Sequence, residues 1–353
     1  MLLFSEDVSG YLLSITLESK IKIEKLVIRL SKKNERIFSP IGQKTVLIHG
    51  KNYNRSIFKI DGIYNEEKQK KFKYWFIVSN NKQIKSKYYF LRFPLLDPSK
   101  PLRIVLFGDI QMQEPLGILE TYMIFLVRKI GKPDFIICMG DLVEKYNKLP
   151  AWHYFFRMMR KIMPNTPFYT TVGNHCGGAD GGQTLLQFLS TPSESLFYSF
   201  QIRNALFITI NSLIYNSNQG YVQLEWLKNQ LKNLDPSIKF VIFWAHMPTF
   251  GPPYNYKDYS PYERVIEEKL KSIFEKYPVD LQFYGHKHSY SREGNKIITA
   301  SIHGVRKYRE SWTEEKKLKN RHHFCILEIN EQRMIMRAIS WWGSEMDRTE
   351  IEK

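Results

Sequence analysis

The stretch FIICMGD at residues 135–141 holds five apolar residues followed directly by a glycine and a carboxylate. An apolar run that ends at such a breaker is typical of a strand buried on both faces of a sheet. Gly140 allows the backbone to turn and to approach another group closely. Asp141 then lies at the carboxyl end of the strand, where open α/β sheets bind their ligands. We therefore predict that Asp141 bridges two metal ions.

Four other apolar runs end in the same way, each at a side chain that can bind a metal ion. They are IVLFGD (104–109), FYTTVGNH (168–175), FVIFWAH (240–246) and LQFYGHKH (281–288). Carboxylate, amide oxygen and imidazole together suit Mn, Fe, Zn or Co, and no thiolate is required. A single Gly-Asp pair is common in turns, but five strand ends in this order predict one metal site.

The length and composition are those of a folded protein with two domains. Of its 353 residues 43% are hydrophobic and 14% aromatic, so a sizeable core is expected and disorder is not. The three cysteines are too few and too widely spaced for a disulfide framework or a zinc knot. No apolar run approaches the ~20 residues that span a bilayer, and residues 1–10 lack the basic charge of a signal peptide. We therefore expect no membrane span and a cytoplasmic location.

The net charge of +17 is compatible with a polyanionic partner such as nucleic acid. Residues 1–100 hold 20 Lys and Arg against 9 Asp and Glu, whereas residues 101–353 hold 32 against 26. The excess therefore lies mainly outside the region of the five motifs. No RNP-type motif, zinc finger or helix-turn-helix signature accompanies it. A lysine-rich surface without a dedicated partner is favoured, and nucleic acid is kept as an alternative.

The chain divides into a strand-rich part and an alternating part. Residues 1–96 contain short β-rich runs without a helical period, at 11–17, 21–28, 45–48, 72–78 and 88–93, which predict a small antiparallel β-sandwich. Residues 97–101 hold two prolines and indicate a linker. Residues 102–343 then alternate strands with helical stretches, which predicts an α/β layered domain. Residues 344–353 are expected to form a frayed, charged tail.

Four helices and a hairpin are expected in the α/β domain. Apolar residues at helical spacing predict helices at 115–130, 152–163, 222–234 and 262–277. Residues 324–329 and 333–340 are expected to form the closing hairpin. The aromatic side chains of the second helix are interpreted as core and not as a cofactor site.

The five motifs resemble the signature of the calcineurin-like metallophosphoesterases and, within that superfamily, the purple-acid-phosphatase branch. The likeness covers about residues 60–340 and includes WHYFF (152–156), QLEWL (223–227) and SYSR (289–292). It implies a four-layer α/β/β/α metallophosphoesterase domain preceded by a fibronectin-like β-sandwich. It also implies a hydrolase of phosphate esters that uses two divalent ions (Mn, Fe or Zn) to activate water and to bind the phosphoryl oxygens.

The same resemblance implies a role for each motif residue. Asp141 would be the bridging ligand, and His175 would protonate the leaving alcohol or stabilise the transition state. Six further residues would bind the metal ions: Asp109, Gln111 and His288 the first, and Asn174, His246 and His286 the second.

Three positions depart from the pattern of the family. Gln111 stands where most of the superfamily has a histidine ligand, although Asp-x-Gln occurs in relatives that resemble ADP-ribose and CDP-alcohol diphosphatases. Glu144 stands where purple acid phosphatases place a metal-binding tyrosine, and Tyr146 is two residues too late to replace it. Cys176 replaces the usual acidic residue after Asn-His. A small polar filler is favoured for Cys176 over a redox-sensitive group.

Weaker candidates lie outside the five motifs. His303 and Arg306 follow the last apolar strand of the alternating part and are tentative substrate contacts. The glycine-rich residues 177–182 lack the Lys and Ser/Thr of a P-loop, so a rim loop beside His175 is expected. His322 and His323 are adjacent and cannot both face one site from a strand, so structural roles are expected.

We therefore expect a metal-dependent hydrolase of a phosphate ester, without a preference among monoester, diester and nucleotide pyrophosphate. A nucleotide pyrophosphatase or a cyclic-nucleotide phosphodiesterase is the alternative among enzymes. A polyanion-binding protein with a vestigial metal site is the alternative from another class. The complete ligand set argues against the vestigial site, because a degenerate site would usually have lost several ligands. The oligomeric state is left open.

Overall fold

The computed structural model describes residues 2–4, 10–18, 22–29, 35–48, 51–61, 71–79, 83–85, 89–92, 100–113, 118–178, 180–214, 217–251, 261–314 and 316–353. Most of the expected linker, residues 97–99, lies outside these ranges. Among the described helices, none has both the length and the apolar character needed to cross a bilayer.

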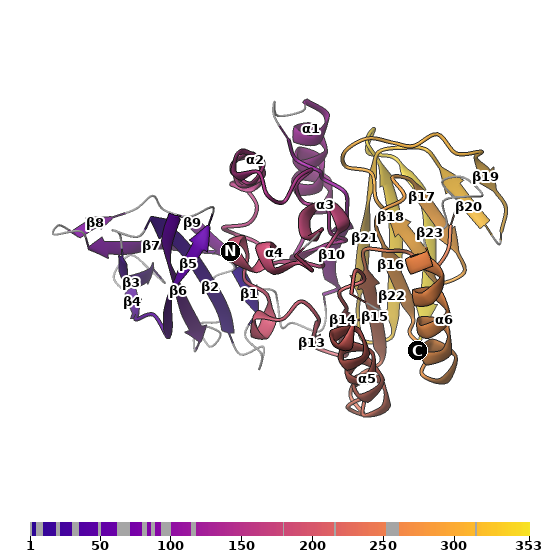
Figure 1. Cartoon of the computed structure of the whole chain (residues 1–353), viewed down its shortest axis with the longest axis horizontal. Coiled ribbons are helices and arrows are strands. Elements are labelled where there is room, and N and C mark those ends of the chain that lie inside the picture. The colour runs from indigo at the N-terminus through magenta and orange to yellow at the C-terminus, as the bar shows by residue number, and fades with distance from the viewer. Residues whose placement is uncertain are drawn as a thin grey trace.

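Two antiparallel sheets form the first part of the chain (Figure 1). One has the order β1-β2-β6-β5, and the other has the order β4-β3-β7-β8 with β9 also paired to β7. The strands are β1 (Leu2–Phe4), β2 (Gly10–Glu18), β3 (Lys22–Arg29), β4 (Glu35–Phe38), β5 (Gly42–Ile48), β6 (Lys51–Asp61), β7 (Lys71–Ser79), β8 (Gln83–Lys85) and β9 (Tyr89–Arg92). Leu13 and Phe58 of the first sheet and Leu26 and Tyr74 of the second belong to one buried cluster. The predicted β-sandwich is confirmed.

Two larger sheets form the second part. The six-stranded sheet has the order β12-β11-β10-β21-β22-β23, and the eight-stranded sheet has the order β13-β14-β15-β16-β18-β17-β20-β19. The first consists of β12 (Phe168–Thr170), β11 (Phe135–Cys138), β10 (Leu102–Phe107), β21 (His323–Ile329), β22 (Arg333–Ser340) and β23 (Glu345–Glu352). The second consists of β13 (Tyr198–Ile202), β14 (Ala205–Thr209), β15 (Phe240–Ala245), β16 (Leu281–Tyr284), β18 (Lys296–Thr299), β17 (Tyr290–Glu293), β20 (Lys316–Lys319) and β19 (Ser311–Trp312).

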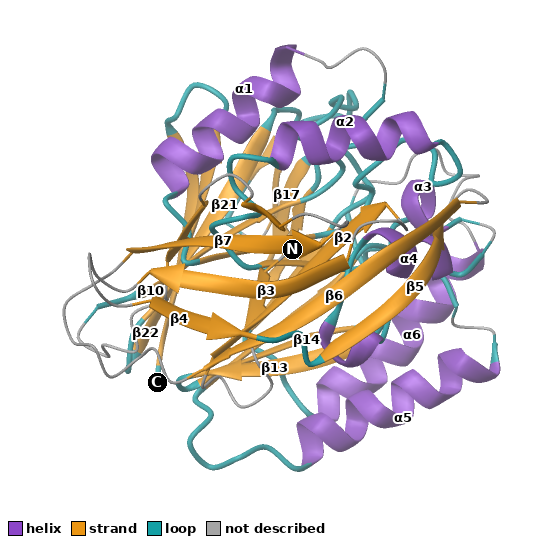
Figure 2. Ribbon diagram, turned by 90° about the vertical axis from the view of Figure 1, so that its left-hand side faces the viewer, coloured by secondary structure: helices purple, strands orange, loops and turns teal. Residues whose placement is uncertain are grey.

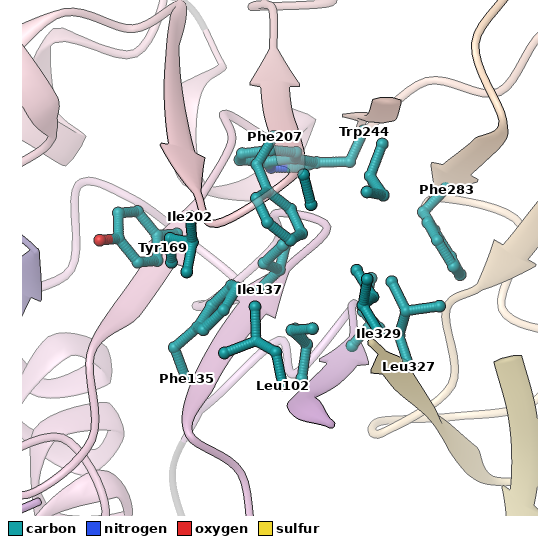
Figure 3. Packing of buried hydrophobic residues seen from close by; sticks show 14 of the residues in the cluster. Leu102, Phe135, Ile137, Tyr169, Ile202, Phe207, Trp244, Phe283, Leu327 and Ile329 are labelled. Atoms are coloured by element: carbon teal, nitrogen blue, oxygen red, sulfur yellow. The ribbon is translucent and has the colours of Figure 1, made fainter. Parts of the chain in front are cut away.

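The two large sheets pack face to face across an apolar core (Figure 3). Along β10, Ile104 and Leu106 belong to this inter-sheet core, whereas Val105 and Phe107 belong to a second cluster on the opposite face. Both faces are apolar because both are covered, which is why the motif strands are continuous apolar runs. The inter-sheet core also takes Ile137, Phe207, Trp244, Phe283 and Leu327.

Helices cover the two outer faces. The six-stranded sheet is covered by α1 (Ile118–Leu126), which continues as a π-helical turn over Val127–Gly131, and by α2 (Leu149–Met159). The eight-stranded sheet is covered by α5 (Asn218–Lys232) and α6 (Pro261–Lys276) (Figure 2). Shorter helices are α3 (Asn174–Gly177), α4 (Gln183–Phe188) and a 3-10 turn over Pro192–Glu194. The predicted four-layer α/β/β/α architecture is confirmed, and the aromatic residues of α2 belong to its core.

The expectation of a frayed tail at residues 344–353 is wrong. Glu345–Glu352 form β23, the edge strand of the six-stranded sheet, paired antiparallel to β22. Asp347 on β23 is buried and accepts hydrogen bonds from Tyr290 Oη (2.6 Å), Arg292 Nε (2.6 Å) and Lys317 Nζ (2.6 Å). These three partners lie on β17 and β20 of the other sheet. Asp347, in the charged segment that suggested a tail, therefore connects the two sheets through polar contacts.

Replacing Asp347 by Asn should reduce stability in a pH-dependent way. Burial alone would raise the pKa of Asp347, but the hydrogen bonds from Arg292, Lys317 and Tyr290 lower it below its ordinary value. The contribution is therefore present above the unfolded pKa of about 3.9 and is lost as pH falls through the lower folded pKa. Urea unfolding at pH 7 should show a loss of about 3 kcal/mol, because two cations lose their buried partner.

The matched control is Glu350→Gln on the same strand, whose ion pair with Arg333 is partly exposed. It should cost less than about 1 kcal/mol. The interpretation of Asp347 would be wrong if the two variants lost equal stability at pH 7, or if the deficit of Asp347→Asn did not shrink between pH 5 and pH 3.

Candidate metal centre

The motif residues meet because the carboxyl ends of five parallel strands lie at one rim. In the six-stranded sheet β10, β11 and β12 run parallel, and in the eight-stranded sheet β15 and β16 run parallel. Backbone hydrogen bonds continue past the strand ends, from Asp109 N to Gly140 O (3.1 Å) and from Gly285 N to His246 O (2.9 Å). The loops that carry the candidate ligands are therefore held to one another as firmly as the strands.

Five candidate ligands have a left-handed backbone conformation. The φ angles are 55° for Asp109, 43° for Gln111, 51° for Asp141, 72° for His286 and 49° for His288. A non-glycine residue with positive φ is uncommon and costs on the order of 1–3 kcal/mol. Such strain gathers at functional sites, where the surrounding structure fixes the backbone. Here it turns each side chain sharply away from its strand and toward the common rim.

Two motif glycines are required by close approach. Gly140 has a φ of 90°, and a Cβ added there would lie 2.9 Å from the backbone nitrogen of Gly173. A Cβ on Gly173 would lie 2.1 Å from the Oδ1 atom of Asp141. These two glycines therefore let the loops that follow β11 and β12 pack closely around the Asp141 carboxylate.

One half of the site is built around two buried carboxylates. Asp109 and Asp141 are both 0% exposed. His288 Nε2 lies 3.3 Å from Asp109 Oδ1, and the backbone nitrogen of His286 donates to both oxygens of Asp109. Gln111 Nε2 lies 3.5 Å from Asp141 Oδ2, and rotation of its amide would present Oε1 instead. Gln111 therefore lies beside Asp141, with which it is predicted to bind the first ion.

The other half brings ring nitrogens of His246 and His286 against the side-chain oxygen of Asn174. His246 Nδ1 lies 2.7 Å from the carbonyl oxygen of Met139 and must donate to it. In the neutral imidazole, Nε2 then presents a lone pair to Asn174 Oδ1 at 2.8 Å and to Asp141 Oδ2 at 3.4 Å. The same Asn174 oxygen lies 2.9 Å from His286 Nδ1. Buried acceptors that face one another are unfavourable alone, and a cation among them would satisfy them.

The electrostatics of the site agree with this reading. Burial raises the pKa of Asp141, and the neighbouring charge of Asp109 adds to the effect. Burial and His246 hold the pKa of His286 well below its ordinary value, so that its nitrogen is available as a ligand. Burial alone would raise the pKa of Asp109, but the hydrogen bond from His288 lowers it below its ordinary value. Ligand atoms of Asp109, Asp141 and His246 lie within 4.8 Å of one another. The donor set of carboxylates, amide oxygens and imidazoles therefore fits hard to borderline divalent ions.

His175 lies beside this cluster at a more open position. Its backbone nitrogen donates to Asp141 Oδ1 (2.8 Å), which fixes the start of α3 against the carboxylate. Its Nδ1 lies 3.0 Å from the carbonyl oxygen of Glu144 and 3.4 Å from the Glu144 carboxylate. The imidazole is about one-third exposed. Because Nδ1 is occupied by Glu144, Nε2 is the atom left for exchange with a substrate.

A cleft of about 300 Å³ opens over the cluster. Gln111 and His288 line it together with His175 and Glu144, and the tentative substrate residues His303 and Arg306 line it too. The structure therefore places both tentative residues beside the seven candidate ligands.

Two residues of the cleft region were missed by the sequence analysis. Glu120 of α1 binds His303 Nδ1 (2.8 Å), and this hydrogen bond lowers the pKa of the Glu120 carboxyl. No pattern connects two positions that lie 183 residues apart. Gln113 also lines the cleft, and the alternation of Asp109, Gln111 and Gln113 was the signal that could have found it.

The remaining candidates have structural surroundings. Cys176 is buried, its sulfur accepts a hydrogen bond from Gly173 N (3.3 Å), and burial raises its pKa to about 12. A neutral, enclosed thiol agrees with the filler favoured for this position. Tyr146 packs its ring over Gly178 and does not line the cleft, as its register predicted. His323 is buried against Ser301 and has its pKa lowered to about 4 by burial.

A sequence model described as calcineurin-like phosphoesterase matches residues 102–290, more than half of the chain. The chain belongs to the calcineurin-like phosphoesterase family. This match covers β10 to β16 and all five motifs.

The similar curated proteins include purple acid phosphatases. Purple acid phosphatase 23 of Arabidopsis thaliana is 27% identical over 175 residues, which cover 46% of this chain and 37% of the relative. Probable inactive purple acid phosphatase 24 of the same plant is 26% identical over 227 residues, with coverage of 54% and 35%. Human acid phosphatase type 7 is 23% identical over 208 residues, with coverage of 54% and 47%. The chain thus matches less than half the length of these relatives.

A solved structure extends the likeness in fold to the β-sandwich. The purple acid phosphatase from yellow lupin (Lupinus luteus) seeds superposes with a TM-score of 0.77 over 99% of this chain and 73% of that chain, at 17% identity. The resemblance to the purple-acid-phosphatase branch is confirmed by these matches. Glu144, at the position where the resemblance implied a metal-binding tyrosine, lines the cleft.

Replacing Asp141 by Asn should release metal. The change removes one negative charge from the centre of the cluster, so that repulsion between two bound cations is poorly offset. We expect the purified variant to retain at least one metal ion fewer than the wild type after dialysis, measured by elemental analysis. Asp235→Asn, at an exposed turn, should keep the wild-type content. Retention of the full metal content in Asp141→Asn would exclude the bridging role.

Replacing Gln111 should change one half of the site only. A neutral amide oxygen binds late transition metals less strongly than imidazole does. We expect Gln111→His to tighten one bound ion and to favour Zn²⁺ over Mn²⁺, and Gln111→Ala to weaken the same ion. Metal titration followed by dialysis measures both. Gln113→Ala, in the same cleft, is the control and should behave as wild type. Identical metal release from all four proteins would show that Gln111 is not a ligand.

Proposed function

We propose that this chain hydrolyses phosphate esters at a dinuclear centre of divalent metal ions. The observation that carries the proposal is the set of buried carboxylate, amide and imidazole groups around Asp141, which a cation among them would satisfy. Family membership supports the chemistry, since calcineurin-like phosphoesterases are named for phosphoester cleavage. Asp109, Gln111 and His288 would hold one ion, Asn174, His246 and His286 would hold the other, and Asp141 would contact both.

Bound divalent ions would supply the activation of water and the neutralisation of phosphoryl oxygens. The residues of the chain then supply orientation and proton transfer. His175 Nε2 would give a proton to the leaving oxygen as its bond to phosphorus breaks, while Nδ1 stays hydrogen-bonded to Glu144. Met139 fixes the His246 ring through its carbonyl oxygen, which keeps Nε2 directed at the cluster. His303 and Arg306 would hold an anionic group of the substrate at the rim of the cleft.

The substrate class is proposed no more narrowly than a phosphate monoester, diester or nucleotide. A nucleotide pyrophosphatase or cyclic-nucleotide phosphodiesterase is the alternative within the same chemistry. Some relatives carry the word inactive in their names, which keeps a vestigial site as the contrary hypothesis. Against it, all seven candidate ligands are present, and they lie in one cluster of contacts. Turnover of aryl monoester, aryl diester and nucleotide substrates with added Mn²⁺, Fe²⁺ or Zn²⁺ tests the proposal, and no turnover in any combination would overturn it.

Replacing His175 by Ala should lower kcat/KM most for esters with poor leaving groups. A general acid contributes roughly 10²–10⁴-fold, and an activated aryl leaving group needs less of that help than an alkyl one. The ratio of kcat/KM for the two esters, compared between wild type and variant, measures the effect. His153→Ala, an exposed histidine on α2, is the control and should leave both rates unchanged. An equal loss on both esters would assign His175 a positioning or electrostatic role instead.

A further inference from the structure

A second cavity lies between the β-sandwich and α2, away from the metal centre. Its volume is about 410 Å³, and its walls are formed by β2 and β7 on one side and by α2 and α4 on the other. It is a half-open groove and not an enclosed void. This cavity has the size of a small-ligand pocket, and such pockets occur preferentially where two domains meet.

Buried polar contacts hold the cavity open. Tyr74 Oη donates to the carbonyl oxygen of Pro164 (2.6 Å), and Ser190 Oγ donates to Ser14 Oγ (2.7 Å). Arg55 is 1% exposed, and its guanidinium donates to the carbonyl oxygens of Leu186 (2.8 Å) and Gln187. Breaking these bonds would leave buried donors and acceptors unsatisfied, at a cost of about 1–3 kcal/mol each. The sandwich is therefore fixed to the second domain and cannot shift inward to fill the space.

The lining is mostly apolar, and the ionisable side chains in it that can carry a positive charge are His153 and Arg160. Leu13, Ile15, Phe76, Phe156 and Met159 form much of the lining. Arg160 ends α2 as an exposed lining residue, and His153 lies two turns before it on the same helix. Among the described lining residues none is acidic, and Arg160 forms no ion pair with a described carboxylate. An apolar cavity with one guanidinium at its rim is complementary to an amphipathic anion.

We propose that this cavity binds a small amphipathic carboxylate, with its apolar body between β2 and α2 and its carboxylate at Arg160. None of the lining residues belongs to the metal centre or its cleft. The proposal therefore stands or falls independently of the phosphoesterase activity.

The test is displacement of a fluorescent probe from the full-length chain. We expect 8-anilinonaphthalene-1-sulfonate to bind saturably with one equivalent, and decanoate to displace it at lower concentration than decanol does. Arg160→Ala should weaken decanoate binding about tenfold, equivalent to about 1.4 kcal/mol. Arg157→Ala removes an arginine of the same helix that does not line the cavity, and its affinity should equal that of wild type. Ile15→Trp should fill the cavity and abolish probe binding.

Three results would overturn the proposal: probe binding that does not saturate, equal decanoate affinity in Arg160→Ala and Arg157→Ala, or displacement by decanol as readily as by decanoate. Undiminished binding in a folded Ile15→Trp variant would place the probe elsewhere and would overturn it too. Circular dichroism verifies the fold of each variant. If Ile15→Trp does not fold, the comparison of the two arginine variants decides the question alone.

Discussion

The structure depends on one electrostatic constraint, the burial of Asp109 and Asp141 side by side. Both carboxylates are fully enclosed, and their ligand atoms lie within 4.8 Å of His246. Two like charges without water are costly, and the contacts of Asp109 with His288 and with the backbone nitrogen of His286 relieve the cost only in part. The positive φ angles of both aspartates add to this free-energy cost. The donor set fits a site for a divalent cation.

The two large sheets provide the rigidity that this constraint demands. The candidate ligands are divided between the sheets, because β10, β11 and β12 belong to one and β15 and β16 to the other. Any sliding of one sheet over the other would separate His246 from Asp141. The interlocked core between them and the buried contacts of Asp347 to Tyr290, Arg292 and Lys317 oppose that sliding. The packing of the two sheets therefore keeps the candidate ligands of one sheet next to those of the other.

The sequence predicted the parts of the fold that rest on local signals. Apolar runs ended by a glycine and a polar residue predicted the motif strands, and the structure brings their last residues together. The same reasoning missed β6, an inner strand of its sheet, because Asn, Arg, Ser and Lys interrupt its apolar pattern. It misread β23, because a charged edge strand has the composition of a tail. It could not find Glu120, since the contact with His303 depends on how α1 packs and not on spacing.

The β-sandwich contributes no candidate ligand, yet its contacts lead to His175. Arg55 on β6 holds the carbonyl oxygens of α4 at Leu186 and Gln187. Phe188, the last residue of α4, stacks on Trp152 with ring centroids 4.2 Å apart. Trp152 Nε1 donates to Tyr146 O (2.8 Å), and Tyr146 N donates to His175 O (3.0 Å). Because each contact is buried or partly buried and directional, the sandwich constrains the loop that orients His175. The sandwich is thereby part of the frame that positions His175.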